Sequence, residues 1–175
     1  AGTSHSYILD TTAPTAVATV TAINADTGSS STDFITNTAS QTVSGTYTGT
    51  LNTGTGTAET IQVSGNGTTW VNASANANNH KWSASGINLA SGSGTLSVRT
   101  VDVAGNVIAG TSHSYTLDTT ISTPTVALTT DSGSSNTDKL TNDASLTVST
   151  TTETVTRTYT VDGGTASSTY VAPTV

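Results

Sequence analysis

The chain has 175 residues, a formal net charge of −7, 33% apolar residues and no cysteine. The absence of cysteine excludes a disulfide framework and the usual thiolate metal sites. Its cations are Lys81, Arg99, Lys139 and Arg157. They form no basic stripe, so a nucleic-acid partner is not expected. The chain has no run of about eighteen apolar residues, and a membrane-spanning segment is therefore not expected either.

Threonine makes up about a quarter of the chain, far above ordinary usage, and glycine occurs 16 times. β-Branched residues favour strands, and glycines favour the turns between them. Helical periodicity with good helix formers is absent from the sequence. The apolar residues alternate with polar ones, which argues against disorder. The composition therefore predicts an all-β chain.

Residues 1–12 read AGTSHSYILDTT and recur as AGTSHSYTLDTT at residues 109–120, so Asp10 and Asp118 are equivalent. Such a repeat at the spacing of one small β-domain indicates tandem modules. Residues 1–9 are predicted to be a strand, the last one of a preceding module. The expected divisions are residues 1–10, with this strand and a hinge, a complete domain over 11–118, and half of a second domain over 119–175.

The complete domain shows seven short strands separated by turn residues, a pattern that predicts a β-sandwich. Ala73–His80 is expected to be an irregular loop, and Trp70 and Trp82 are expected to fill the core. The strands are predicted at Thr15–Asn24, Gln41–Tyr47, Glu59–Ser64, Trp70–Asn72, Lys81–Ser85, Gly94–Asp102 and Val107–Leu117.

The second module repeats the beginning of the first one: Asp26–Asn37 returns as Asp131–Asn142. Its predicted strands are Val126–Leu128, Leu146–Val148, Arg157–Val161 and Tyr170–Val171. A half-sandwich leaves one apolar face and one sheet edge bare. Either the chain belongs to a longer array, or another copy supplies the missing strands. Residues 1–9 are the segment that such an exchange would donate.

The acidic residues recur at equivalent positions in the repeats. In a sandwich, the loop after the first strand lies where the last strand leaves, which brings Asp26, Asp33 and Asn37 near Asp118. The turn after Asp102 lies at the other end of the domain, near Asp10. The second module repeats the loop with Asp131 and Asp138.

Carboxylates gathered in this way repel one another unless a cation screens them, and Ca²⁺ suits oxygen ligands in flexible geometry. The alternative is a set of plain turns in which each aspartate accepts a local backbone hydrogen bond. A single loop favours the turns. The recurrence of hinge, loop and turn favours calcium. His5, His80 and His113 show no shared ligand spacing and are expected to be solvated.

Several segments together resemble bacterial Ig-like repeats: IQVSGNGTTW at 61–70, VRTVDVAGN at 98–106 and LDTT at 117–120. These repeats build the stalks of giant surface adhesins, usually exported by type I secretion. The resemblance implies an Ig-like sandwich in tandem, with Ca²⁺ ions that stiffen the junctions. It implies no active site. One departure is Ile121–Pro124, because proline commonly follows the D-T-T directly in the family.

Two functions are expected from these features. The first is a non-enzymatic stalk module of a secreted, cell-surface adhesin, with neighbouring repeats as partners and a host or surface glycan bound by other regions. The second is a glycan- or ice-binding module that uses threonine rows such as Thr42–Thr50, together with Trp70 and Trp82. Exposure of both tryptophans on one flat face would favour a glycan site. Glu59 and Glu153 have no partner acid near in sequence, which gives little support to acid–base catalysis.

Overall fold

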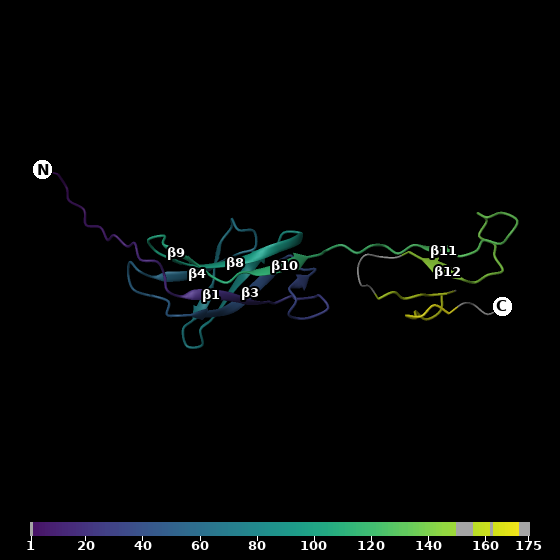
Figure 1. Ribbon diagram of the computed structural model, residues 1–175, viewed down its shortest axis with the longest axis horizontal. Coiled ribbons are helices and arrows are strands. Elements are labelled where there is room, and N and C mark those ends of the chain that lie inside the picture. The colour runs from purple at the N-terminus through teal and green to yellow at the C-terminus, as the bar shows by residue number, and fades with distance from the viewer. Residues whose placement is uncertain (1, 150–155, 162, 172–175) are drawn as a thin grey trace. The chain divides into compact units, whose positions relative to one another are not determined.

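A computed structural model describes residues 2–149, 156–161 and 163–171 (Figure 1). The chain divides into two compact units, unit 1 over residues 1–119 and unit 2 over residues 120–175, and each is described by itself. The described residues form strands and turns, without a helix. They accordingly contain no helix that is long and apolar enough to cross a membrane.

Unit 1 consists of two packed sheets, and the predicted all-β sandwich is confirmed. The β1 sheet has the strand order β1-β3-β7-β6. The β8 sheet has the order β2-β10-β8-β4-β5, with β9 also paired to β8. The strands are β1 (Val17–Ile23), β2 (Ile35–Thr36), β3 (Ser40–Thr48), β4 (Glu59–Ser64), β5 (Val71–Asn72), β6 (Ser74–Asn76), β7 (Lys81–Asn88), β8 (Gly92–Asp102), β9 (Val107–Ala109) and β10 (His113–Leu117).

The core lies between the sheets because alternate residues of each strand point inward. In β8 the inward residues include Leu96, Val98 and Thr100. The buried apolar residues are Ala16, Ala18, Val20, Ile23, Phe34, Val43, Tyr47, Ile61, Val63, Trp82, Ala84, Ile87, Leu89, Leu96, Val98, Tyr115 and Leu117.

One side of the sandwich is crossed by a strand that changes sheets. β5 pairs with β4 in the β8 sheet, and β6 pairs with β7 in the β1 sheet. Ala73 joins them and donates its backbone N–H to the carbonyl of Ile61 at 2.8 Å. The prediction of an irregular loop over Ala73–His80 is therefore wrong for its first part. The segment is too polar for its alternation to stand out in the sequence.

The other side is crossed at Gly110. The strand predicted over Val107–Leu117 is divided there into β9 and β10, and Thr111 exchanges backbone hydrogen bonds with Ala18 and Val20 of β1. A Cβ on Gly110 would lie 2.3 Å from the carbonyl oxygen of Ala18. Only glycine permits this approach, which links β1 to the opposite sheet.

The two tryptophans differ, so the prediction that both fill the core is wrong for Trp70. Trp82 is 2% exposed and donates its indole N–H to the carbonyl of Thr46. Trp70 is half-buried and lies just before β5, at the margin of the β8 sheet. The position of each tryptophan relative to the strands determines whether it is buried, and residue type alone does not predict that position.

The prediction of a strand over residues 1–9 is also wrong, because residues 2–9 are extended without a strand assignment. Tyr7, Ile8 and Leu9 are 86%, 80% and 77% exposed. The near-identical sequence at residues 113–117 forms strand β10, because β8 and β2 flank it. Exchange of residues 1–9 with another copy stays a prediction.

Unit 2 contains a two-stranded sheet of β11 (Val126–Leu128) and β12 (Leu146–Val148), which matches two predicted strands. The strands predicted over Arg157–Val161 and Tyr170–Val171 are not found. A single β-bridge joins Tyr159 to Ser167 instead, and the ring of Tyr170 lies 5.9 Å from that of Tyr159. In unit 1 the equivalent strand β4 pairs with β8 as well as with β5, and the described residues of unit 2 contain no counterpart of β8.

Candidate functional site

The strand registers of unit 1 define its two poles. Leu117 of β10 pairs with Gly92 at the start of β8 and with Thr36 of β2, and these residues mark the far pole. Asp102 ends β8 at the opposite, near pole. The far pole is therefore the end of the sandwich where Asp118 follows β10, and the near pole is the end where Asp102 closes β8.

The far pole is formed by the loop after β1, and two of its aspartates are held by backbone donors. Asp26 Oδ2 accepts the N–H of Phe34 at 3.0 Å. Asp33 accepts the N–H groups of Ile35 and Ser30, at 3.0 and 3.1 Å. Such bonds are those of the plain turns that the sequence left open as an alternative.

The hydrogen bonds of this loop lower the pKa of Asp33 and leave one oxygen of Asp26 without a donor among the described residues. The N–H of Ile35, followed by that of Ser30, holds the pKa of Asp33 below its ordinary value, and a contact with the Asp26 carboxyl acts in the same direction. Asp26 Oδ1 is buried and has no hydrogen-bond partner among the described residues. A buried carboxylate oxygen without a donor is costly, and a cation is one group that would satisfy it.

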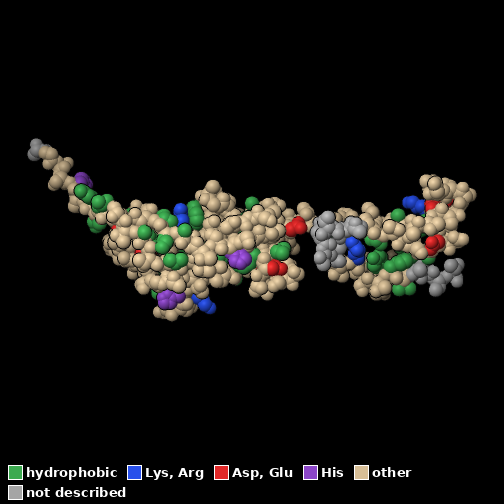
Figure 2. Space-filling model, viewed as in Figure 1, with side chains coloured by type: hydrophobic (Ala, Val, Ile, Leu, Met, Phe, Trp, Pro, Cys, Tyr) green, Lys and Arg blue, Asp and Glu red, His purple; other side chains and the backbone are tan. Residues whose placement is uncertain are grey.

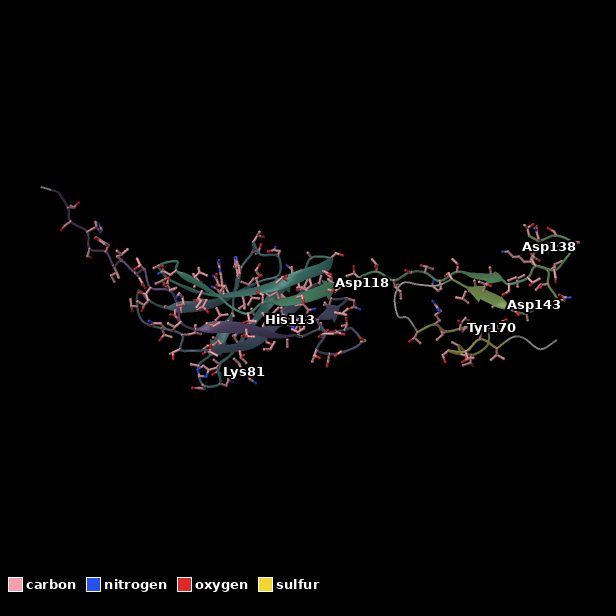
Figure 3. The ribbon with its side chains drawn as sticks, viewed as in Figure 1. Lys81, His113, Asp118, Asp138, Asp143 and Tyr170 are labelled. Carbon is pink, nitrogen blue, oxygen red and sulfur yellow. The ribbon has the colours of Figure 1, made fainter. Side chains whose placement is uncertain are left out.

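Asp118 lies at the same pole, directly after β10 (Figure 3). Its N–H donates to the carbonyl of Thr36 at 2.9 Å, which places it beside Asn37. Asn37 Oδ1 accepts the hydroxyls of Thr27 and Thr38. On the face of unit 1 seen in Figure 2, the conspicuous acidic side chains lie at one end of the unit.

At the near pole, Asn106 connects Asp10 to Asp102. Its side-chain amide donates to Asp102 Oδ2 at 2.9 Å and to the carbonyl of Asp10 at 3.1 Å. Asp102 Oδ1 accepts the N–H groups of Ala104 and Asn106. The Asn106 amide is the main cause that holds the pKa of Asp102 below its ordinary value. The turn over residues 102–106 (DVAGN) is thus hydrogen-bonded to the hinge at Asp10 and connects it to the end of β8.

Glu59 belongs to the near pole as well, and sequence reasoning missed it. It lies directly opposite Asp102 in the pairing of β4 with β8. Together with Asp10 these residues line a hollow of about 610 Å³. In the sequence, Glu59 has no acid near it. The strand register supplies the neighbour.

The loop of unit 2 repeats the geometry of the far pole. Asp131 Oδ2 accepts the N–H of Lys139 at 3.0 Å, and Asp138 Oδ1 accepts that of Leu140 at 3.0 Å. Asp131 Oδ1 is again buried without a partner among the described residues. The same oxygen is therefore left over in both copies of the loop.

Within the described residues, no three His, Cys, Asp or Glu side chains lie close enough together to hold a metal ion. The structure instead brings the acids together in smaller sets, with Asp26 beside Asp33 and Asp102 opposite Glu59. Other calcium ligands would have to come from backbone carbonyls, hydroxyls and water. Calcium binding by the predicted residues stays a prediction.

Comparison with known families assigns the fold. A family model for the bacterial Ig-like domain matches residues 12–119. The chain belongs to the bacterial Ig-like domain family. None of the curated proteins matches it. Bacterial Ig-like domains are often extracellular or surface-associated and are typically not enzymes. The family does not by itself extend to the narrower group of calcium-dependent adhesin repeats.

This bacterial Ig-like domain also uses its histidines in a way that the sequence did not reveal. His113 was expected to be solvated, but its ring stacks on Phe34 with centroids 3.7 Å apart. Phe34 has φ +59° and is 3% exposed. His80 contacts Tyr47 edge-on at 5.1 Å. These rings are packing elements, and Phe34 anchors the far-pole loop to β10.

Proposed function

We propose that this chain is an extension module in the stalk of a secreted bacterial surface adhesin. The observation that carries the proposal is the near-verbatim recurrence of residues 1–12, which precede one Ig-like domain, at residues 109–120, which contain the last strand of that domain and the hinge after it. A module that begins and ends with the same hinge sequence is suited to repetition. Its partners are then the neighbouring modules of the same array.

We further propose that Ca²⁺ stiffens the modules at their poles. At the far pole, Asp26 and Asp33 would hold the ion with Asp118 and Asn37 beside them, and Asp131 and Asp138 would do so in unit 2. At the near pole, Asp10 and Asp102 are the candidates. The residues fit a hard cation in one respect, since the unpartnered Oδ1 atoms of Asp26 and Asp131 are acceptors without donors.

Calcium would stabilise the folded module in two ways. An ion that binds the folded pole and not the unfolded chain stabilises the fold by mass action. It would also neutralise carboxylates that otherwise repel each other. The structural consequence would be a hinge with fewer accessible conformations, and hence a straighter stalk.

The test is thermal unfolding and small-angle X-ray scattering of the chain with calcium and with a chelator. We expect calcium at about 100 times its Kd to add roughly 2.7 kcal/mol per site and to raise the Tm. The distribution of intramolecular distances from the scattering data should be narrower with calcium than with chelator. Mg²⁺ serves as the matched ion and should have a smaller effect, because it gives up its waters reluctantly.

The variant Asp26→Asn distinguishes a loss of calcium binding from a loss of folding. It removes the carboxylate charge, but Asn keeps an oxygen that accepts from the N–H of Phe34. It should fold in chelator and lose much of the calcium-dependent gain in Tm. If chelation changes neither the Tm nor the scattering, calcium bracing is wrong, and the module spaces the array without an ion.

The alternative of a glycan site on two exposed tryptophans is not favoured. Trp82 is buried and bonded within the β1 sheet, so the pair does not form one exposed face. No feature of the threonine rows separates an ice-binding surface from an ordinary solvated sheet. The stalk function is therefore the better supported of the two.

A further inference from the structure

A row of polar side chains crosses the outer face of the β8 sheet. The strand registers place Asn72 of β5 opposite Gln62 of β4, and Gln62 opposite Arg99 of β8. Gln62 connects the row: its amide N–H₂ donates to Asn72 Oδ1, and its Oε1 accepts from Arg99 Nε, both at 2.9 Å. The side chains in the row are therefore fixed relative to one another.

Trp70 supports the guanidinium of Arg99 from one side. The Arg99 Cζ atom lies 4.0 Å from the centroid of the Trp70 ring, which is a cation–π contact. Arginine side chains ordinarily lose considerable rotamer entropy when they bind a ligand. Here the Gln62 bond and the Trp70 ring have already restricted the side chain. The guanidinium is oriented before any ligand arrives.

Arg99 has bonding capacity left. A guanidinium carries five N–H donors, and only Nε has a partner among the described residues. No carboxylate in the described part of the chain forms an ion pair with Arg99, although the protein has a net charge of −7. The terminal N–H groups form the fork that matches a carboxylate with two parallel hydrogen bonds.

We propose that Trp70, Gln62, Asn72 and Arg99 form a binding site for an acidic saccharide, with Arg99 receiving the carboxylate of a uronic-acid residue. The exposed amide of Asn72 lies in the same row and suits sugar hydroxyls, being both a donor and an acceptor. This site is independent of the poles and of the stalk proposal. It also differs from the two-tryptophan platform, because it uses one ring and a cation.

The surroundings favour a saccharide over a peptide. A peptide commonly adds to a free sheet edge, but Gln62 and Arg99 lie on the interior strands β4 and β8, and the edge strand β5 is only 2 residues long. The outward residues around the row on β4 and β8 are the polar Thr60, Thr95 and Ser97, together with one apolar residue, the half-buried Val101. Such a surface offers hydrogen bonds but little apolar area to bury, which matches a sugar better than a peptide chain.

The test is a two-dimensional NMR titration of the chain with trigalacturonic acid, reading the Arg99 Nε–H and the Trp70 indole N–H signals. We expect both to shift with a Kd on the order of millimolar, as befits an exposed ion pair. Arg99→Gln should weaken binding at least about tenfold, and Arg99→Lys should also weaken it because the fork is lost. The NMR spectra of the variants report whether each is folded.

The control variant is Lys81→Gln, which removes the other cation of unit 1 from the opposite sheet (Figure 3). It should change the affinity by less than about twofold. The fully methyl-esterified trisaccharide should not bind. The proposal is overturned if Arg99 and Trp70 do not respond, if the ester shifts them equally, or if Lys81→Gln and Arg99→Gln weaken binding alike. Tighter binding of triglutamate would reassign the site to a protein partner.

Discussion

Glu59 and Asp102 lie directly opposite each other on the paired strands β4 and β8, with like charges on facing positions. Glu59 Oε2 also accepts the N–H of Asn52 at 3.2 Å. Like charges directly opposite in an antiparallel pair are destabilising. The near pole therefore contains a local repulsion that the fold tolerates.

Glu59→Gln should relieve this repulsion, since glutamine keeps an acceptor for the N–H of Asn52. We expect the free energy of unfolding in chelator to rise by about 0.2–1 kcal/mol, measured by urea denaturation. The gain should shrink in about 1 M salt, which screens the charges. A variant less stable than the parent at low salt would contradict this reading of the pair.

Asn106→Ala should weaken the near pole and change its response to acid. The variant loses the bonds from the Asn106 side chain to Asp102 Oδ2 and to the Asp10 carbonyl. A net loss of about 1 kcal/mol from these two bonds should lower the Tm by roughly 4–8 °C. A calorimetric scan at neutral pH would measure this.

The pH dependence of that variant follows from the lowered pKa of Asp102. A carboxyl with a lowered folded-state pKa stabilises the fold above the unfolded pKa of about 3.9 and loses this effect as the pH falls through the folded value. Without the Asn106 amide, the folded pKa moves back towards the unfolded one. The urea midpoint should then fall less steeply from about pH 5 to pH 2 than in the parent. An equal slope would exclude Asn106 as the cause.

Gln41→Leu should destabilise unit 1, although leucine is the residue at the equivalent position 146 of unit 2. Gln41 is 1% exposed, and its amide donates to the carbonyls of Ala25 and Thr38 and to the hydroxyl of Thr36. Leucine would leave buried acceptors without donors, at about 1–3 kcal/mol. Urea denaturation measures the loss. The conservative variant Gln41→Glu, which keeps the shape but not the donors, should be destabilised as well.

Lys139→Gly should stabilise the loop of unit 2. Lys139 has φ +60°, a left-handed conformation that costs an ordinary residue about 1–2 kcal/mol. Hydrogen exchange of the amides over residues 131–142 should slow in the variant. The equivalent Phe34→Gly is the contrasting case, because it also removes a buried ring stacked on His113. It should be destabilised by roughly 3 kcal/mol or more.

The fold could be predicted from local alternation where the two faces of a strand differ clearly. The central parts of β8 and β4 are of this kind, since the buried residues Leu96 and Val98 of β8, and Ile61 and Val63 of β4, alternate with polar residues. The change of sheet at Ala73 and the break at Gly110 could not be predicted, because both depend on which strand lies across the sandwich. The same holds for Trp70, whose exposure depends on its place at the margin of a sheet.

The candidate site could be predicted in part for a related reason. The repeat marked Asp26 and Asp33 and their equivalents, and sandwich topology placed Asp118 at the same pole. Glu59 and Arg99 could not be found in this way. Their neighbours are Asp102 and Gln62, on strands about 40 residues apart in sequence. A pairing register is needed to bring such residues together.

The strand crossings at Ala73 and Gly110 have a consequence for biogenesis. Chains built from near-identical neighbours tend to misfold by exchanging strands between adjacent copies. In unit 1, the backbone at Ala73 and at Thr111 forms hydrogen bonds across the sides of the sandwich, so the N–H groups of Ala73, Thr111 and Val20 are already paired there. In a tandem array of the kind proposed above, each module would therefore fold without exchanging strands with its neighbours at these two crossings.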